Sequence, residues 1–241
     1  MKINKPKISI VLPCYNEENN ILNTFYTISK SLKLSKISNY ELIFIDDGSN
    51  DNSKFIINKI IKEYKKRVNF KKKFLIHNLG LGAAFKEGVK ISSGDYLMFV
   101  PTDNSHPTKG LVEIFKSIKW EKKDSILLSY VKNKKKRSLT RQFISKIYTF
   151  ILNFIFVTKI KYFNGLNIYP IKILKRHINQ TTGFSFQTEI IISAIKDKYK
   201  YYYVGTTISE RSAGSTRAFK ISNIISVVLS VMKLIYKIYV K

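Results

Sequence analysis

Three groups of polar residues that could bind a phosphorylated nucleotide each follow directly after a short apolar segment. These are residues 15–17 (Tyr-Asn-Glu), the pair Asp46 and Asp47, and Asp103. A carboxylate at Asp46 or Asp47 could accept a hydrogen bond from a base N–H or a ribose hydroxyl. Asp103 could hold Mg²⁺ or Mn²⁺, which bridges two phosphates and neutralises a departing diphosphate. These residue types therefore indicate chemistry on a nucleotide diphosphate.

Each of these acids also has a purely structural interpretation. An Asp in a turn most often caps a helix or stabilises the turn itself. Capping accounts for Ser49 and Asp51, which precede a helical pattern. It accounts poorly for two adjacent acids in front of Gly48.

Other candidate residues lie further along the chain. Residues 78–84 are rich in glycine and resemble a phosphate-binding loop at a helix start, although no Gly-Lys-Ser of a Walker loop follows. Glu189 is polar among apolar residues and is either a paired structural acid or a functional one. Arg211 and Arg217 flank Gly214, and guanidinium groups suit bidentate phosphate binding, whereas the alternative is ordinary surface charge. The histidines lack metal-ligand spacing, and no nucleophilic triad is visible.

The elements that must position these residues alternate in type. Short β-branched segments are typical of buried strands, and segments with apolar residues at a 3.6 period are typical of helices. This alternation predicts an α/β domain with a mostly parallel central sheet and helices on both faces. Ligands bind beyond the carboxyl ends of such strands, so we expect the polar groups to converge on one sheet edge. The predicted strands are residues 8–12, 40–45, 74–76 and 96–100, and the predicted helices are residues 17–34, 51–64 and 83–91.

Two later segments read as apolar helices with a narrow polar stripe. Residues 143–158 carry Lys146 on that stripe, and residues 221–241 carry several lysines on theirs. Such helices either lie in a membrane interface or pack on the core. Neither reaches the roughly 20 apolar residues of a membrane span. No signal peptide is expected, because the first apolar segment ends at Pro13, and the single cysteine, Cys14, rules out an internal disulfide framework.

The chain of 241 residues carries a net charge of +27. Such an excess attracts polyanions, although a lysine-rich composition throughout the chain explains it equally well. A non-enzymatic basic protein that binds nucleic acid or membrane is therefore the competing hypothesis, supported by the basic residues 132–137. No nucleic-acid-binding module is visible, so we expect no nucleic-acid partner.

Taken in order, the motifs are more specific than any one of them. They are residues 10–18, 46–51, 78–88, 93–96, 103–107, 183–189 and 211–217. With them the chain resembles glycosyltransferase family 2, and within it the dolichyl-phosphate-mannose-synthase-like branch of polyprenyl-phosphate glycosyltransferases. The resemblance implies a single Rossmann-like GT-A domain over residues 1–217, including an interfacial helix at about 141–159. A C-terminal amphipathic, membrane-associated helix would follow over residues 218–241.

The resemblance also implies roles for individual residues in an inverting transfer from a nucleotide-diphosphate sugar linked to UDP or GDP. Asp103 would bind the metal and act in catalysis, and Arg211 and Arg217 would close over the diphosphate. If the acceptor is a sugar hydroxyl, a base is needed, and either Glu189 or the neighbourhood of Asp103 would supply it. The nucleotide-sugar-binding residues would be Pro13, Tyr15, Glu17, Asp46, Asp47, Thr102, Arg211 and Arg217.

The family's Asp-x-Asp motif is incomplete here, because Pro101 stands in place of its first acid. Dependence on Mg²⁺ or Mn²⁺ is therefore left open. The expected acceptor is a polyprenyl (dolichyl or undecaprenyl) phosphate at the cytoplasmic face of an anionic membrane, with peripheral attachment and a membrane-protein partner. The alternative is a sugar hydroxyl in cell-surface polysaccharide synthesis.

Overall fold

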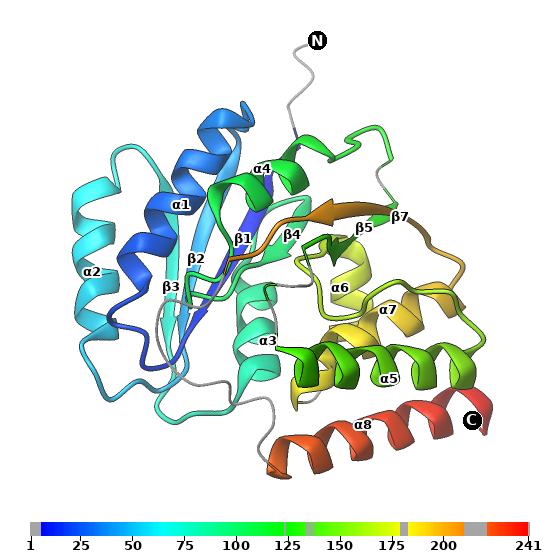
Figure 1. Ribbon diagram of the computed structural model, residues 1–241. Helices are drawn as coiled ribbons and strands as arrows, with labels where there is room; N and C mark the ends of the chain where they lie inside the picture. The colour runs from blue at the N-terminus through cyan, green and yellow to red at the C-terminus, as the bar shows by residue number, and fades with distance from the viewer. Residues whose placement is uncertain are drawn as a thin grey trace.

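The computed structural model describes residues 6–122, 124–133, 136, 138–178, 183–209 and 221–240. Its centre is a seven-stranded sheet in the order β3-β2-β1-β4-β6-β5-β7 (Figure 1). The strands are β1 (Ile8–Cys14), β2 (Tyr40–Asp46), β3 (Asn69–Phe74), β4 (Tyr96–Phe99), β5 (Ser125–Val131), β6 (Ile168–Pro170) and β7 (Lys200–Thr206). The helices are α1 (Ile21–Leu34), α2 (Ser53–Tyr64), α3 (Leu81–Ile91), α4 (Thr108–Lys116), α5 (Leu139–Phe156), α6 (Ile171–His177), the 3₁₀ turn η3 (Gly183–Ser185), α7 (Phe186–Lys196) and α8 (Ile221–Tyr239).

The sheet is mostly parallel, as the sequence predicts. Strand β1 pairs in parallel with both β2 and β4, and β3 extends the sheet beyond β2. Only β6 runs antiparallel to its neighbours β4 and β5 among the described strands. The carboxyl ends of β1, β2 and β4 consequently meet at one edge.

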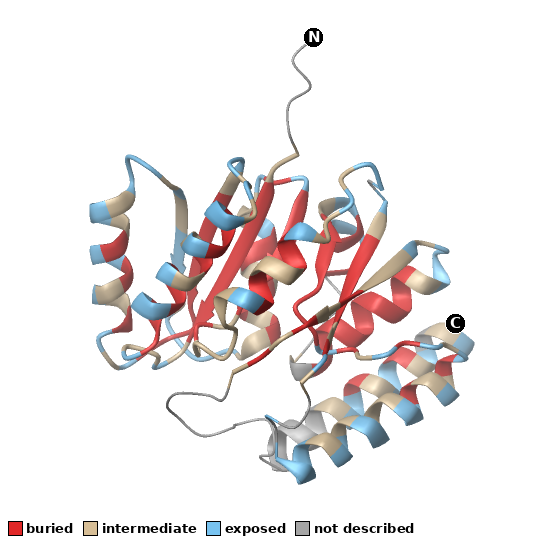
Figure 2. Ribbon diagram, turned by 45° about the horizontal axis from the view of Figure 1, so that its top comes forward, coloured by how far each residue is buried: buried red, intermediate tan, exposed pale blue. Residues whose placement is uncertain are grey.

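Helices cover both faces of the sheet, and the residues of each strand alternate between the two cores. On β1, Ile10 and Leu12 join the core under α1, α2 and α4, whereas Val11 joins the core under α3, α6 and α7. Figure 2 shows the buried residues concentrated in the strands and on the inner faces of these helices. Burial on both faces explains why the central strands β1, β2 and β4 are mostly apolar.

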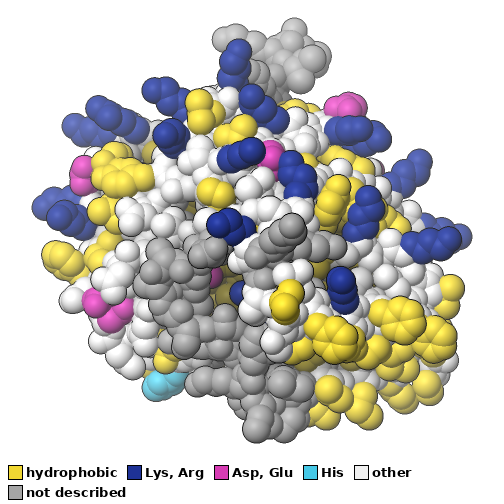
Figure 3. All heavy atoms as spheres, viewed as in Figure 1, with side chains coloured by type: hydrophobic (Ala, Val, Ile, Leu, Met, Phe, Trp, Pro, Cys, Tyr) yellow, Lys and Arg dark blue, Asp and Glu magenta, His cyan; other side chains and the backbone are white. Residues whose placement is uncertain are grey.

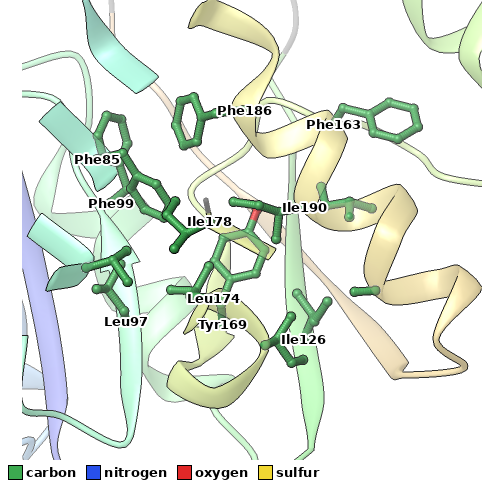
Figure 4. Close-up of a cluster of buried hydrophobic side chains, with 14 of the residues drawn as sticks. Phe85, Leu97, Phe99, Ile126, Phe163, Tyr169, Leu174, Ile178, Phe186 and Ile190 are labelled. Carbon is green, nitrogen blue, oxygen red and sulfur yellow. The ribbon is translucent and has the colours of Figure 1, made fainter. Parts of the chain in front are cut away.

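An aromatic cluster in the second core joins α7 to the sheet. The ring of Phe186, at the start of α7, lies 4.7 Å from Phe85 of α3 and 5.3 Å from Phe99 of β4, measured between centroids. Figure 4 shows Phe186 facing these two rings, with Tyr169 and Ile190 in the same cluster. The start of α7 is thereby held close to the end of β4.

The structure corrects several element bounds. The predicted strand 74–76 is wrong, because β3 occupies Asn69–Phe74 at the sheet edge, where three consecutive lysines lie between Phe70 and Phe74. Helices α1 and α2 begin later than predicted, at Ile21 and Ser53, because the residues before them form turns at the strand ends. Helix α5 begins earlier, at Leu139, where the hydroxyl of Ser138 accepts from the backbone N–H of Arg141.

The two apolar helices α5 and α8 lie alongside each other at one end of the molecule (Figures 1 and 2). Their C-terminal ends meet where the rings of Phe156 and Tyr239 stack at 6.3 Å. Among the described residues, no helix combines the length and the hydropathy that a transmembrane span requires.

Candidate active site

Asp46 is the last residue of β2 and lies opposite Cys14 of β1 in the parallel register. Its carboxylate is fully buried, and Oδ1 accepts a hydrogen bond of 3.0 Å from the backbone N–H of Ser49. The Nζ of Lys54 lies 3.8 Å from the same oxygen. The other oxygen, Oδ2, is buried and receives no hydrogen bond from any described residue. Because an unsatisfied buried acceptor costs about 1–3 kcal/mol, a ligand N–H that reached Oδ2 would bind favourably.

The turn after β1 is held against the turn after β2. The backbone N–H of Asn16 donates to the hydroxyl of Ser49 at 2.9 Å, and that of Glu17 donates to the hydroxyl of Ser53 at 3.0 Å. Asn16 adopts a positive φ of 54°, a conformation that Asn tolerates better than most residues. These contacts place Tyr15 and Glu17 beside Asp46, as the convergence of strand ends predicts.

Asp47 holds the glycine-rich turn in front of α3. Its Oδ1 accepts from the backbone N–H of Leu79 at 2.8 Å, and its Oδ2 accepts from the backbone N–H of Gly80 at 2.8 Å and from Nδ2 of Asn78 at 3.0 Å. Burial raises the pKa of Asp47, although the two backbone hydrogen bonds oppose that rise. The carboxylate of Asp47 is therefore occupied by the turn, which leaves Asp46 as the better placed acceptor for a nucleoside.

Close backbone approach explains two glycines in this region. A Cβ on Gly82 would lie 2.4 Å from the carbonyl oxygen of Gly183, so α3 and η3 meet there without room for a side chain. Gly48 has a φ of +72°, and a Cβ on it would lie 2.6 Å from the backbone carbonyl carbon of His77. Both glycines thus bring distant segments together around the strand ends.

The turn after β4 carries Thr102 and Asp103. The hydroxyl of Thr102 is buried and donates to the carbonyl oxygen of Pro13 at 2.7 Å. The Oδ1 of Asp103 accepts from both the backbone N–H and the hydroxyl of Ser105, at 3.1 and 2.6 Å. The Asp103 side chain is therefore oriented by its own turn, next to the end of β1.

The segment after β7 is attached to the same turn. The backbone N–H of Ser209 donates to the carbonyl oxygen of Ser105 at 3.1 Å, and Asn133 exchanges hydrogen bonds of 2.8 and 3.0 Å with the backbone of Ile208. Arg211 follows Ser209 by two residues in the chain, but Arg211 and Arg217 lie outside the described residues.

Glu189 lies in the first turn of α7 and is buried. The hydroxyl of Ser185 donates to its Oε1 at 2.7 Å. The adjacent Thr188 shares a hydrogen bond of 2.8 Å with the hydroxyl of Tyr148 on α5. Burial raises the pKa of Tyr148 to about 12, and the nearby charge of Glu189 adds to that rise. Glu189 is therefore a positioned acid at the end of the sheet where α7 meets β4.

A metal would find few protein ligands near Asp103. Among the described residues, no three side chains of His, Cys, Asp or Glu are grouped to hold an ion. Mg²⁺ nevertheless needs only one or two carboxylates when phosphates and water complete its coordination. The donors around Asp103 thus fit a cation that the bound diphosphate helps to hold, and they do not form a site complete in itself. Cys14 offers no alternative ligand, because burial raises the pKa of its thiol to about 12.

Sequence reasoning missed the serines that position the acids. Ser49 and Ser53 accept hydrogen bonds from the turn after β1. Ser105 orients Asp103, and Ser185 donates to Glu189. Ser105 and Ser185 lie within four residues of their acids, so short-range Ser–acid spacing was a usable signal for them. The contacts of Ser49 and Ser53 span more than 30 residues and carry no such local signal.

The chain is similar in sequence to known proteins. The family model "Glycosyl transferase family 2" matches residues 9–183, from β1 to the start of η3. The poly(ribitol-phosphate) beta-N-acetylglucosaminyltransferase TarP of Staphylococcus aureus is 27% identical over 243 residues, a match that covers 96% of this chain and 72% of TarP.

Two solved structures share the fold. Residues 1–349 of S. aureus TarS in complex with UDP match with a TM-score of 0.56 and 17% identity, over 96% of this chain and 64% of TarS 1–349. The mannosyltransferase PcManGT of Pyrobaculum calidifontis, in complex with GDP-Man and Mn²⁺, matches with a TM-score of 0.65 and 11% identity, over 96% of this chain and 65% of that chain.

Proposed function

Because the chain belongs to glycosyl transferase family 2 and is a glycosyltransferase, we propose that it transfers a sugar from a nucleotide-diphosphate donor to a hydroxyl group of a phosphate-containing cell-wall polymer. The observation that carries the proposal is the buried Asp46 carboxylate, whose Oδ2 receives no hydrogen bond from the described residues. It supports donor binding because uracil and guanine both present ring N–H groups to such an acceptor.

The donor lies across the ends of β1, β2 and β4 in this proposal. Asp46 accepts from the base, and Pro13, Tyr15 and Glu17 lie on the adjoining turn. Thr102 and Asp103 lie beside the diphosphate of the donor, and Arg211 and Arg217 neutralise its negative charge. Mg²⁺ or Mn²⁺, held by Asp103 and the donor phosphates, supplies further charge neutralisation when bound.

The acceptor hydroxyl attacks the anomeric carbon of the sugar with inversion. The bond from that carbon to the diphosphate oxygen breaks, and the nucleoside diphosphate leaves with the electron pair. A hydroxyl acceptor must lose its proton, and the carboxylate of Glu189 takes it as general base. The hydrogen bond from Ser185 supports this role, because it orients the carboxylate at the start of α7.

A polymer with phosphate groups suits the charge of this protein. The net charge of +27 attracts a polyanion, and long-range attraction raises the rate at which charged substrates are encountered. TarP, whose name specifies poly(ribitol-phosphate), supports the same acceptor class. A hydroxyl acceptor is the alternative that the sequence left open.

A polyprenyl phosphate is the second candidate acceptor. The exposed apolar residues of α5 favour it, because they suit a protein that works at a lipid surface. The predicted dolichyl-phosphate-mannose-synthase-like branch, the peripheral cytoplasmic location and the membrane-protein partner belong to this candidate and stay predictions. A phosphate acceptor is already ionised at neutral pH, so it would need no general base.

The test is a transfer assay with UDP- and GDP-sugars, Mn²⁺, and either poly(ribitol phosphate) or undecaprenyl phosphate as acceptor. We expect labelled sugar to appear on the polymer and the Asp103→Ala variant to lose transfer. Transfer to undecaprenyl phosphate alone would replace the proposed acceptor with the second candidate. A full rate in Asp103→Ala would contradict the placement of the donor.

A further inference from the structure

Helix α5 exposes large apolar side chains along one side. Phe150 is 71% exposed and Phe154 is 79% exposed, values far from those of a core helix. The opposite side of α5 is buried through Leu152 and Phe156. The exposed apolar residues of the helix are Leu139, Phe143, Ile144, Ile147, Phe150, Ile151 and Phe154.

Helix α8 is built in the same way. Ser230 and Leu234 are buried against the core, and the hydroxyl of Tyr239 donates to the carbonyl oxygen of Ile155 at 2.7 Å. The remaining side is exposed and carries Val228, Leu229, Met232, Tyr236 and Tyr239. The helix thus packs on the body and still presents an apolar side to solvent.

The exposed residues named for α5 and α8 are together called the α5/α8 face. Figure 3 shows apolar side chains gathered at the lower right of the molecule, where Figure 1 places α5 and the end of α8. Contiguous apolar patches of this kind mark interaction sites on soluble proteins. By contrast, α2 exposes a single large apolar side chain, that of Phe55.

The two helices that form the α5/α8 face carry charges of one sign only. No Asp or Glu occurs between Asp124 and Glu189, a stretch that includes all of α5, and none follows Glu210. Lys146 and Lys233 are exposed on the two helices, and Lys159 is exposed just after α5. A partner for this face must therefore offer an apolar surface together with negative charge.

We propose that the α5/α8 face docks on an anionic lipid bilayer, with its aromatic and aliphatic side chains among the acyl chains and its lysines at the headgroups. A bilayer with anionic lipids supplies both properties in one surface. A second copy of the chain would supply the apolar surface but would bring like charges together. The inference concerns attachment and is independent of the proposed acceptor.

Docking through this face would also place the candidate active site near the lipid. The inner side of α5 reaches α7 through the hydrogen bond between Tyr148 and Thr188, and Thr188 precedes Glu189. The turn that begins α7 is therefore one helix away from the α5/α8 face. Acceptors held at a membrane surface could reach it without extraction into solution.

The test is co-sedimentation of the full chain with vesicles. We compare vesicles of phosphatidylcholine with vesicles that also contain phosphatidylglycerol, using Phe150→Ser/Phe154→Ser and the matched control Phe55→Ser. We expect the wild type and the control to bind anionic vesicles, and the double variant to bind at least about tenfold more weakly, since it lacks two aromatic side chains that would be buried in the bilayer. Lys146→Glu/Lys233→Glu should weaken binding to anionic vesicles, while Lys62→Glu should not.

A second measurement does not depend on the stability of the serine variant. Phe150→Trp should show quenching by brominated lipids, and Phe55→Trp should not, with the native Trp120 contributing equally to both. Equal binding by the wild type and Phe150→Ser/Phe154→Ser would overturn the proposal. A wild-type dimer that Phe150→Ser/Phe154→Ser converts to a monomer, with no vesicle binding, would overturn it in favour of a second copy.

Discussion

The hydroxyl of Thr102 donates a buried hydrogen bond of 2.7 Å to the carbonyl oxygen of Pro13, and so joins the ends of β4 and β1. This contact sets the spacing between the turn that carries Tyr15 and the turn that carries Asp103. Thr102→Val keeps the shape of the side chain but leaves the carbonyl of Pro13 without its donor. We expect a loss of about 1–3 kcal/mol in the free energy of unfolding and weaker nucleotide binding.

Urea denaturation and calorimetry with UDP and GDP measure the two effects of Thr102→Val. Thr102→Ser retains the hydroxyl and should recover most of both. If Thr102→Val binds nucleotide as tightly as the wild type, the spacing of the two turns does not matter for binding.

Asp46→Asn tests the nucleoside site. The amide oxygen of Asn can still accept from the N–H of Ser49, so the fold should persist. The other position becomes an N–H₂ donor facing the base N–H, and a charged acceptor is lost. A hydrogen bond to a charged group contributes about 1.5–3 kcal/mol, so we expect nucleotide affinity to fall at least tenfold. Titration calorimetry measures the affinity, and Asp95→Asn, beyond the opposite end of the strands, is the control.

Pro101→Asp tests the metal site by restoring the first acid of the Asp-x-Asp motif. With a second carboxylate two residues before Asp103, we expect Mn²⁺ affinity without nucleotide to rise at least tenfold. Free Mn²⁺ measured by electron paramagnetic resonance reports this directly. Pro101→Asn removes the proline without adding charge and should bind Mn²⁺ like the wild type. Equal affinities for the two variants would show that position 101 does not face the metal.

Glu41 makes the stability of the fold depend on pH in the acid range. Burial alone would raise the pKa of Glu41, but hydrogen bonds from Ser9, Ser93 and Lys7 outweigh it and lower the pKa to about 2. Between its ordinary pKa of 4.5 and this value, the folded protein binds fewer protons than the unfolded chain. The free energy of unfolding therefore falls as the pH drops from 4.5 to 2, by an amount on the order of 2 kcal/mol once solvent screening of the partly exposed lysines is allowed for.

Denaturation curves at several pH values measure this dependence. Glu41→Gln should be less stable at neutral pH and should lose most of the dependence in that range. An unchanged slope in Glu41→Gln would assign the dependence to other carboxylates.

The first half of the fold and its convergent acids could be predicted because they leave local signals. Residues 8–12 are buried on both faces of the sheet and are apolar except for Ser9, and Asp46 directly follows another apolar segment. Strand β3 was misplaced because its lysines give no apolar segment, and pairing with β2 decides where it forms. The short antiparallel strand β6 has three residues, too few for any period to show.

The contacts that distinguish Asp46 from Asp47 depend on tertiary structure. Asp46 and Asp47 look equivalent in the sequence. The carboxylate of Asp47 accepts hydrogen bonds from the glycine-rich turn, whereas Oδ2 of Asp46 receives none from the described residues. Likewise, the two readings of residues 221–241 as a core or an interfacial helix are not exclusive, because α8 buries Leu234 and exposes Met232. Local patterns predict which residues gather, whereas the surrounding packing determines what each can still bind.

Glu189→Gln separates the two acceptor classes. The amide oxygen of Gln can still accept from the hydroxyl of Ser185, so the start of α7 should keep its structure and stability. The amide cannot take a proton, and general base catalysis contributes about 10²–10⁴-fold. With a hydroxyl acceptor we therefore expect kcat to fall by about 10²-fold or more with little change in the KM for the donor. The limb of the pH–rate profile that rises as the base ionises should disappear. Ser185→Ala, which removes only the orienting hydrogen bond, should lower kcat less and keep that limb. If Glu189→Gln retains the wild-type rate and profile, Glu189 is a structural acid, and an acceptor that is already ionised, such as a lipid phosphate, becomes the better explanation.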